Sequence, residues 1–195
     1  TFYKLSIKKI NYFLFIAFIT IKISDVNDNR PQFRYQVYRG VITENAVQGT
    51  PIVHVDADDL DSNKTVIYSL EGHNDIVNLV KIDPFTGDVS VAQRIDRERH
   101  SWINLTLRAS DSGNPPLFGL SNLNIQVLDE NDNNPIFGPD SRTEFTITED
   151  APIGSLVGAV HANDEDFGVF GKVTYLLDAS SSDGKFKIDR ETVRN

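Results

Sequence analysis

The sequence has no cysteine, no methionine and a single tryptophan among its 195 residues. The absence of cysteine excludes a disulfide scaffold, a cysteine zinc site and a thiol nucleophile. It does not fix the compartment, because a domain with an adequate core can be secreted without disulfides. Since the chain begins at Thr1 and has no methionine, we expect it to be part of a longer protein.

Basic charge is also scarce. Lysine and arginine number 19 against 28 aspartates and glutamates, which gives a net charge of −9. A nucleic-acid partner requires a basic surface that binds phosphate, so this balance excludes that class of function. Apolar residues make up 39% of the chain and aromatic residues 10%. This content is sufficient for a buried core.

Long apolar runs are missing as well. The longest, residues 10–21, is interrupted by polar side chains and is shorter than the roughly 18 apolar residues that a membrane-spanning helix needs. Lysines precede the run, a layout typical of a secretory signal. However, Ile19, Ile21 and Ile23 alternate with polar residues, the period of a half-buried strand. We therefore favour a strand at residues 19–24 over a signal.

The chain repeats itself with a period of slightly more than a hundred residues. The segment Asp25–Phe33 returns as Asp129–Phe137, an offset of 104 (129 minus 25). Four further pairs follow in the same order at offsets of 105 to 107: Thr43–Asn45 with Thr148–Asp150, Ala57–Asp61 with Ala162–Asp166, Val66–Tyr68 with Val173–Tyr175, and Ile82–Asp83 with Ile188–Asp189. A period of this length is a whole domain, so the repeat predicts tandem copies of one domain type.

Each period is predicted to consist of strands. Short apolar runs bounded by turn residues predict strands at 33–44, 52–55, 66–70, 79–82, 89–91, 103–109 and 123–127. In the sixth of these, Ile103, Leu105 and Leu107 alternate with polar residues and are expected to face the core. About seven strands in a hundred residues are typical of a two-sheet sandwich. We predict an all-β fold of tandem seven-stranded, Greek-key (immunoglobulin-like) β-sandwiches with only local helix.

Acidic residues gather at strand ends and in the segments that join the repeats. In the full repeat they are Glu44, Asp59, Asp61, Asp96, Glu98 and Asp111, and the joining segment adds Asp129, Glu130 and Asp132, together with the amide side chains of Asn131 and Asn133. Carboxylates held close together raise one another's pKa, and a divalent cation removes that cost. Ca²⁺ binds about six to eight oxygens from carboxylates, amides and carbonyls, whereas Mg²⁺ prefers a small octahedron. The recurrence of the groups favours Ca²⁺ over the alternative that Asp and Asn simply occupy turns.

Two other interpretations of the acidic residues, an EF-hand and a catalytic acid pair, do not fit the sequence. An EF-hand loop that began at Asp25 would place Arg30 at the position of its glycine and Gln36 at that of its final glutamate. A pair of catalytic acids, as in glycoside hydrolysis, should occur once and not in every repeat. The four histidines are scattered and accompany no nucleophile. We do not expect an enzyme.

With these motifs in view, residues 19–195 resemble tandem cadherin repeats. The resemblance rests on the Asp-x-Asn-Asp-Asn connectors, the Asp96-Arg97-Glu98 motif and the Ala-x-Asp-x-Asp motif, which occurs once in each repeat. It implies Ca²⁺ ions that lie between successive sandwiches. For the second connector it implies these ligands: Glu44, Asp96, Glu98, Asp129, the Glu130 carbonyl and Asp132 for two ions, and Asn131, the Asn133 carbonyl, Asp164 and Asp166 for a third.

The first connector has a less complete set of ligands. Its candidates are Asp25, Asn27, Asp28, Asn29, Asp59, Asp61 and Asp111. The Glu and Asp-Arg-Glu motifs of a preceding repeat are absent, and Ile7 stands where a counterpart of Asp111 would be. By the same resemblance, residues 1–24 end in the last strand of a preceding repeat, residues 25–133 form a complete repeat with its calcium linkers, and residues 134–195 begin another.

The function implied by the resemblance is calcium-dependent cell–cell adhesion. The chain would belong to the extracellular side of a membrane-anchored protein, with other cadherin-like ectodomains as homophilic or heterophilic partners. Its plain connectors resemble those of protocadherins and Fat-type proteins. A structural spacer or receptor segment without adhesive contacts is the alternative. Asn104 and Asn63 each begin an N-glycosylation sequon, and strand parity directs Asn104 outward.

Overall fold

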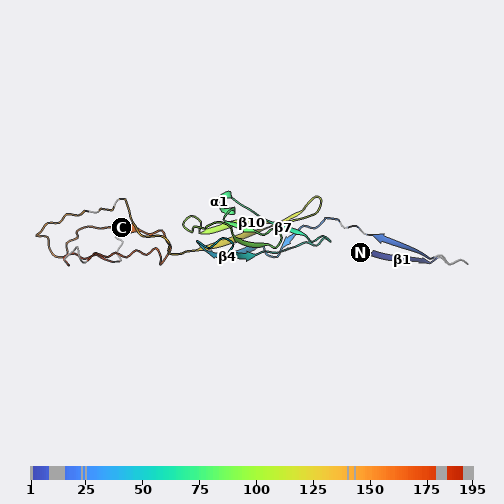
Figure 1. Cartoon of the computed structure of the whole chain (residues 1–195), viewed down its shortest axis with the longest axis horizontal. Helices are drawn as coiled ribbons and strands as arrows, with labels where there is room; N and C mark the ends of the chain where they lie inside the picture. The colour runs from blue at the N-terminus through green and yellow to red at the C-terminus, as the bar shows by residue number, and fades with distance from the viewer. Residues whose placement is uncertain are drawn as a thin grey trace.

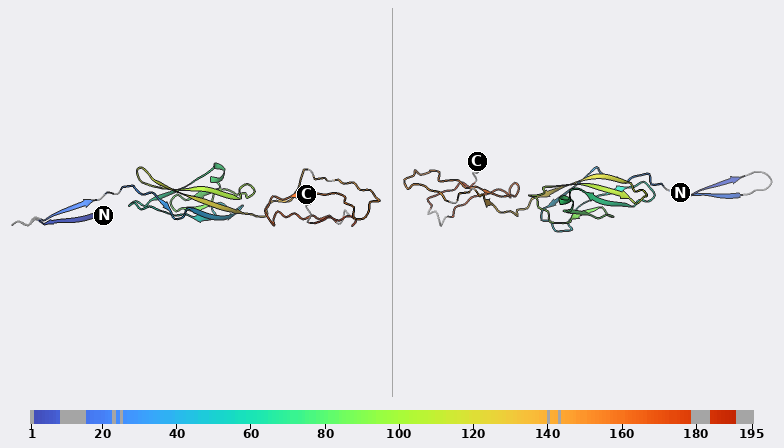
Figure 2. Two further views of the ribbon diagram at one scale, coloured as in Figure 1. Left: turned by 180° about the vertical axis from the view of Figure 1, so that it is seen from behind. Right: turned by 90° about the horizontal axis from the view of Figure 1, so that it is seen from above.

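The computed structural model describes residues 2–8, 16–22, 24, 26–139, 141–142, 144–178 and 184–190. The chain is elongated, with a central β-sandwich between a two-stranded hairpin on its N-terminal side and a second segment on its C-terminal side (Figures 1 and 2). The two connectors, of which the structure describes residues 26–29 and 129–133, therefore lie at opposite ends of the sandwich.

Strands account for nearly all of the regular structure. They are β1 (Phe2–Lys8), β2 (Ile16–Lys22), β3 (Gln32–Phe33), β4 (Val37–Thr43), β5 (Pro51–His54), β6 (Ala57–Asp58), β7 (Val66–Glu71), β8 (Val80–Ile82), β9 (Asp88–Val91), β10 (Trp102–Asp111), β11 (Phe118–Leu128), β12 (Ile136–Phe137) and β13 (Ala162–Asn163). The helix α1 (Asn74–Val77) is a single turn. In the part of the chain that the structure describes, no helix is long and apolar enough to cross a membrane.

The central sandwich confirms the predicted all-β fold. One sheet has the order β4-β11-β10-β7 and the other β5-β9-β8. In the first sheet β10 is antiparallel to both of its neighbours, whereas β4 is parallel to β11. Ile103, Leu105, Leu107 and Ala109 of β10 are all buried between the sheets. Their period of two places every second side chain in the core, as the alternation in the sequence predicts.

The strand predicted at residues 33–44 is in fact two strands in different sheets. Phe33 in β3 pairs with Ala57 of β6, whereas β4 pairs with β11. A strand that changes sheet must leave one hydrogen-bond ladder before it joins the next, which accounts for the break at residues 34–36. The switch brings the end of β4, and Glu44 after it, to the same edge as the end of β11.

The turn between β8 and β9 needs a glycine. Gly87 has φ +77°, and a Cβ there would lie 2.2 Å from the Val55 carbonyl oxygen. The Gly87 carbonyl in turn accepts a hydrogen bond from the Val55 amide at 3.0 Å. A positive φ is a conformation that glycine adopts at no steric cost, which makes it a common turn residue.

The segment after residue 134 repeats contacts of the sandwich. β12 pairs with β13 as β3 pairs with β6. The Tyr175 hydroxyl accepts a hydrogen bond from the Ala162 amide at 2.8 Å, and Tyr68 accepts one from the Ala57 amide at 2.9 Å. The repeat found in the sequence is therefore also a repeat of tertiary contacts.

The hairpin before the first connector is antiparallel, with Phe2 opposite Lys22 and Lys8 opposite Ile16. The alternation of isoleucines predicts a strand at residues 19–24, and the second strand of the hairpin, β2, includes residues 19–22 of that range. Residue 23 lies outside the described part of the chain.

Candidate metal centre

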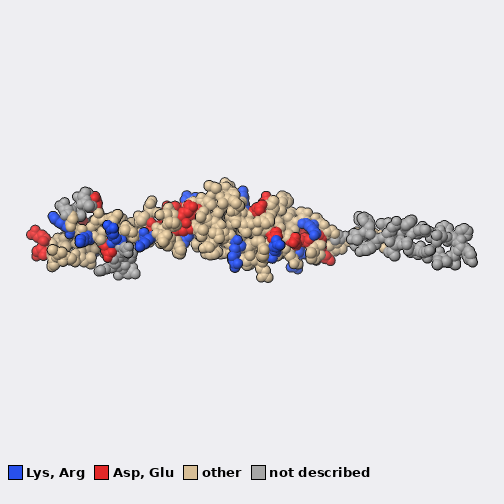
Figure 3. Space-filling view, turned by 90° about the horizontal axis from the view of Figure 1, so that it is seen from below, with Lys and Arg blue, Asp and Glu red and all other residues tan. Residues whose placement is uncertain are grey.

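Acidic side chains gather at both ends of the sandwich (Figure 3). The end at which β4 and β11 finish carries the denser cluster. Three segments converge there: residue 44 after β4, the loop 95–98 before β10, and the connector 129–133 after β11. We call this cluster the second joint.

Glu44 ties these segments together. Its side chain is buried, with 1% exposure. Its Oε2 accepts a hydrogen bond from the Arg97 amide and its Oε1 one from the Glu130 amide, both at 2.9 Å. A buried carboxylate held by two amides is fixed in position, while each oxygen keeps lone-pair capacity for a cation.

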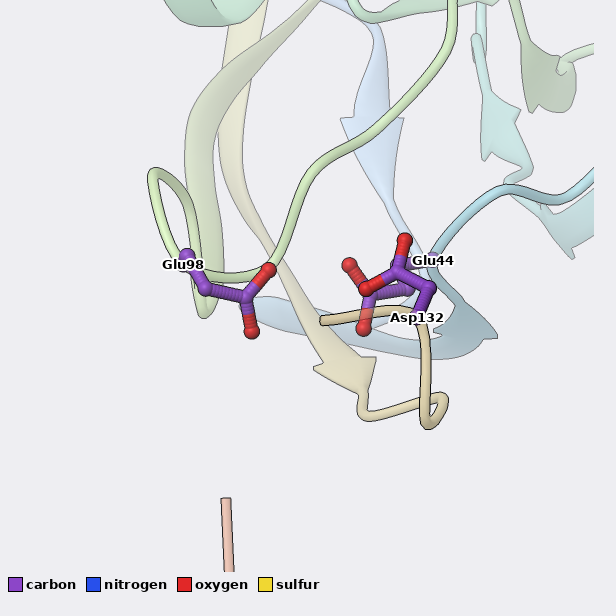
Figure 4. A group of neighbouring side chains, drawn as sticks. All are labelled: Glu44, Glu98 and Asp132. Atoms are coloured by element: carbon purple, nitrogen blue, oxygen red, sulfur yellow. The ribbon is translucent and has the colours of Figure 1, made fainter. Parts of the chain in front are cut away.

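Two groups of acids at the second joint could each hold a metal ion. The first is Glu44, Glu98 and Asp132 (Figure 4), and the second is Glu98, Asp129 and Asp166. In each group, one carboxylate oxygen from every member lies within 4.8 Å of the others. Glu98 belongs to both groups. Asp166 comes from the segment after residue 134, so the second group joins the two sides of the connector.

The electrostatics of the joint disfavour three bare carboxylates. Burial raises the pKa of Glu98, its own backbone amide lowers it, and the negative charges of Glu44, Asp132 and Asp129 raise it further, with a net upward shift. Glu98 Oε1 and Asp129 Oδ1 are buried without a hydrogen-bond partner. An added positive charge would satisfy both oxygens and offset the repulsion.

The Asp-x-Asp loop of the second segment is pre-formed. The Asp166 amide donates to Asp164 Oδ1 at 3.0 Å, and the Asn133 side chain donates to Asp166 Oδ1 at 2.7 Å. The first segment has the same arrangement: the Asp61 amide donates to Asp59 Oδ1 at 2.8 Å, and Asn29 donates through its side chain to Asp61. Both loops therefore hold carboxylates beside the connector that precedes them.

Other predicted residues of the second connector lie near the groups without joining them. Asp96 Oδ1 accepts the Arg99 amide at 3.1 Å. Glu130 and Asn131 are exposed. Neither Asp96 nor Asp164 is a member of the two acid groups.

The first connector is ordered by hydrogen bonds. Asn27 donates to Asp111 Oδ2 at 3.1 Å. Burial raises the pKa of Asp111, but the hydrogen bonds from the Gly113 and Leu117 amides and from Asn27 outweigh it, and the net shift is downward. Asp59, Asp61 and Asp111 are buried.

The remaining residues of the first connector provide fewer candidate metal ligands than the second joint. Asp28 is exposed and its Oδ1 accepts a bond from the Asn29 side chain at 2.9 Å, and Asp25 lies outside the described residues. No group of three acids with metal-ligand spacing forms at this connector within the described ranges. Asp59 Oδ2 is nevertheless buried without a hydrogen-bond partner. A cation at this end would therefore need further ligands.

The sequence did not predict the contacts that several residues make around the second joint. Asn45 donates to Asp132 Oδ2 at 2.7 Å and accepts from Arg94 at 2.6 Å. Arg97 Nη1 lies 3.2 Å from Asp129 Oδ1, and its guanidinium lies over the Phe167 ring. The Asp-Arg-Glu motif marked Arg97 as a neighbour of ligands, but its contacts depend on the folded chain.

The chemistry of the donors fits a hard divalent cation. The two acid groups offer only carboxylate oxygens, and carbonyls and amide side chains of the connector lie nearby. Ca²⁺ favours such oxygen ligands at about 2.3–2.6 Å and tolerates irregular coordination. The described chain places no histidine in either group, which makes the site a poor match for Zn²⁺.

Comparison with known proteins agrees with this arrangement. The family model described as "Cadherin domain" matches residues 38–128. The chain is 40% identical over 176 residues to Cadherin EGF LAG seven-pass G-type receptor fmi-1 of Caenorhabditis elegans, and 36% identical over 178 residues to Protocadherin Fat 4 of Mus musculus. These alignments cover 89% and 90% of the chain, but only 7% and 4% of the two relatives.

Solved structures give the same result for the fold. Mouse Cadherin-23 EC22-24 aligns with a TM-score of 0.73 at 32% identity and covers 84% of this chain and 53% of that one. Protocadherin Gamma B7 extracellular cadherin domains 1-4 aligns with a TM-score of 0.69 at 30% identity, over 97% of this chain and 47% of that one.

Proposed function

The chain belongs to the cadherin superfamily, and from this premise we propose that it is a calcium-stiffened segment of an extracellular region that acts in cell–cell adhesion. The parent would be a membrane-anchored cadherin-like protein, with other cadherin-like ectodomains as partners. We further propose that it has no catalytic role. The proposal rests on the family and on the second joint.

The observation that carries the proposal is the make-up of the two acid groups. Their oxygens come from the sandwich (Glu44 and Glu98), from the connector (Asp129 and Asp132) and from the following segment (Asp166). A cation bound by both groups would have ligands on either side of a five-residue connector. The free energy of metal binding would then appear as order between the two sides.

We propose that the chain divides at its two connectors. Residues 25–133 would be one complete repeat, residues 134–195 the start of the next, and residues 1–24 would end in the last strand of a preceding one. The shared contacts of Tyr68 and Tyr175 support the second boundary. At the first connector we propose weaker calcium binding, because the described residues there form no comparable acid group.

We also propose N-glycosylation at Asn104. It is exposed on β10 in the four-stranded sheet, where a glycan would meet solvent. Asn63 is exposed too, but its side-chain amide donates to Ser112 at 2.7 Å. Modification at Asn63 would remove one donor of that amide and is the weaker candidate.

Calcium binding and stiffening are tested on the purified chain. Isothermal titration with Ca²⁺ should give a heat signal, and small-angle scattering should give a longer, narrower distance distribution with Ca²⁺ than with chelator. Asp166→Asn should weaken binding, whereas Asp75→Asn, an equal charge change on the exposed helix α1, should not. Absence of heat, together with identical scattering curves, would refute the stiffening.

Adhesion is tested separately with beads coated with the chain. Adhesion predicts clumping in Ca²⁺ and none in chelator, since a joint without its bound cations is less rigid and presents a less uniform surface. Binding and stiffening without clumping would favour the structural spacer and overturn adhesion by this segment.

A further inference from the structure

The side chain of Arg97 lies inside the second joint. Its Nη1 is 3.2 Å from Asp129 Oδ1 and 3.6 Å from Glu98 Oε1. These are the two buried oxygens of the joint that lack a hydrogen-bond partner. The Arg97 side chain is itself only 16% exposed. One positive charge of the chain therefore faces oxygens that a bound cation would also use.

The other contact of Arg97 crosses the connector. Its guanidinium carbon lies 4.5 Å from the centroid of the Phe167 ring, within the distance at which a cation is attracted to an aromatic face. The Phe167 amide donates to Asp129 Oδ2 at 2.8 Å. Arg97, Asp129 and Phe167 thus contact one another in a closed set that includes both sides of the joint.

This closed set does not follow from the repeat pattern. Ser62 stands in the first repeat where Phe167 stands in the second, at the offset of 105 that relates the Asp-x-Asp motifs. A serine offers no aromatic face. The contact is therefore a property of the second joint and not of the domain type.

We propose that Arg97 is a built-in cation of the joint, which with Phe167 holds the following segment against the sandwich in the absence of metal and releases Asp129 and Glu98 to Ca²⁺. This proposal rests on the proposed function, because it concerns regulation of the same site. Arginine suits this role since its planar guanidinium can pair with a carboxylate and stack on a ring at once. Upon metal binding the ring contact can persist, because it uses no carboxylate.

Two consequences follow. The metal-free joint keeps a preferred geometry, so the change upon calcium binding is smaller than for an unbraced connector. The metal must also displace a positive charge, so calcium binds more weakly than it would to the acids alone. Loss of Arg97 therefore loosens the metal-free joint and tightens calcium binding, a pair of opposite effects that general damage to the fold does not produce.

The experiment measures a distance across the joint in the whole chain. Because the protein has no cysteine, Lys81→Cys and Thr146→Cys place two spin labels at unique exposed sites, one on each side. Double electron–electron resonance then gives the distance distribution in chelator and in Ca²⁺. The variants are Arg97→Gln and Phe167→Leu, which keeps apolar volume without a π-face. Arg99→Gln is the matched control, since Arg99 is exposed and carries the same charge.

In chelator, the distribution should broaden for Arg97→Gln and Phe167→Leu and stay unchanged for Arg99→Gln. Calcium affinity by titration should rise about threefold or more for Arg97→Gln, as expected when a unit charge next to a divalent ion is removed. An unchanged distribution for both joint variants, or weaker calcium binding by Arg97→Gln, would overturn the proposal. If the two joint variants broaden the distance distribution but the chain binds no calcium, the role of Arg97 and Phe167 in the metal-free joint is supported. The proposed stiffening by metal is then refuted.

Discussion

Substitution of Glu98 by glutamine should have opposite effects on stability with and without calcium. Glu98 belongs to both acid groups, and the facing oxygens of each group lie within 4.8 Å. Two unit charges at that separation repel by about 0.9 kcal/mol in water. Glu98 has several such neighbours and one partly compensating partner, Arg97 at 3.6 Å. We expect Glu98→Gln to stabilise the metal-free chain by about 1–2 kcal/mol.

The raised pKa of Glu98 also predicts that Glu98→Gln stabilises the metal-free chain. The pKa of Glu98 is raised in the folded chain. The ionised form of such a carboxyl group destabilises the folded state relative to the unfolded state. Glutamine has nearly the same shape and no charge, so it removes this penalty without a cavity.

With calcium the sign reverses, because a charged ligand is lost. A tenfold weaker affinity removes about 1.4 kcal/mol of the stabilisation that saturating metal provides. Urea unfolding of the wild type and Glu98→Gln, each in chelator and in millimolar Ca²⁺, measures both effects. Asp75→Asn serves as the control for a simple change in net charge. A substitution that destabilises the chain equally under both conditions would contradict the account of Glu98 as a shared metal ligand.

Three further predictions concern the sandwich. Leu107→Ala should lower the free energy of unfolding by about 2–5 kcal/mol, because Leu107 is fully buried; a loss below about 1 kcal/mol in urea unfolding would refute the packing. The chain expressed in secretory cells should carry a glycan, detected by mass spectrometry as added mass, and Asn104→Gln should remove that mass. If the glycan mass is the same in the wild type and in Asn104→Gln, Asn104 is excluded as the site. Hydrogen bonds from the Thr86 and Phe85 amides lower the pKa of Asp83, so its contribution to stability is present above the unfolded pKa and is lost as pH falls through the folded one. The stability difference between wild type and Asp83→Asn should therefore shrink below roughly pH 4, and a difference independent of pH would refute it.

The sequence predicted those parts of the fold that depend on local patterns. Alternation along Ile103, Leu105 and Leu107 gave the buried face of β10, because a strand has a fixed period of two. The repeat offset paired Asp61 with Asp166, and both amides make the same hydrogen bond within their Asp-x-Asp loops. Such features need only neighbours along the chain.

Contacts between distant residues could not be predicted in the same way. Arg97 and Phe167 are 70 residues apart (167 minus 97), and their contact depends on the path of the connector and on both side-chain rotamers. The pairing of Asn45 with Asp132 depends on where β4 and β11 end relative to each other. The break between β3 and β4 was also not predicted, because the apolar residues of a segment do not reveal which sheet each part of the segment joins.

The parallel pairing of β4 with β11 determines how the sandwich responds to a pulling force. Seven residue pairs, from Val37 opposite Asn122 to Thr43 opposite Leu128, join the two strands in register. Tension on the two connectors draws β4 towards the first and β11 towards the second, so it slides the strands along each other. Sliding loads the evenly spaced hydrogen bonds of a parallel ladder together, whereas peeling would break them one at a time. The domain is therefore built to resist stretching along its long axis until the whole ladder ruptures at once.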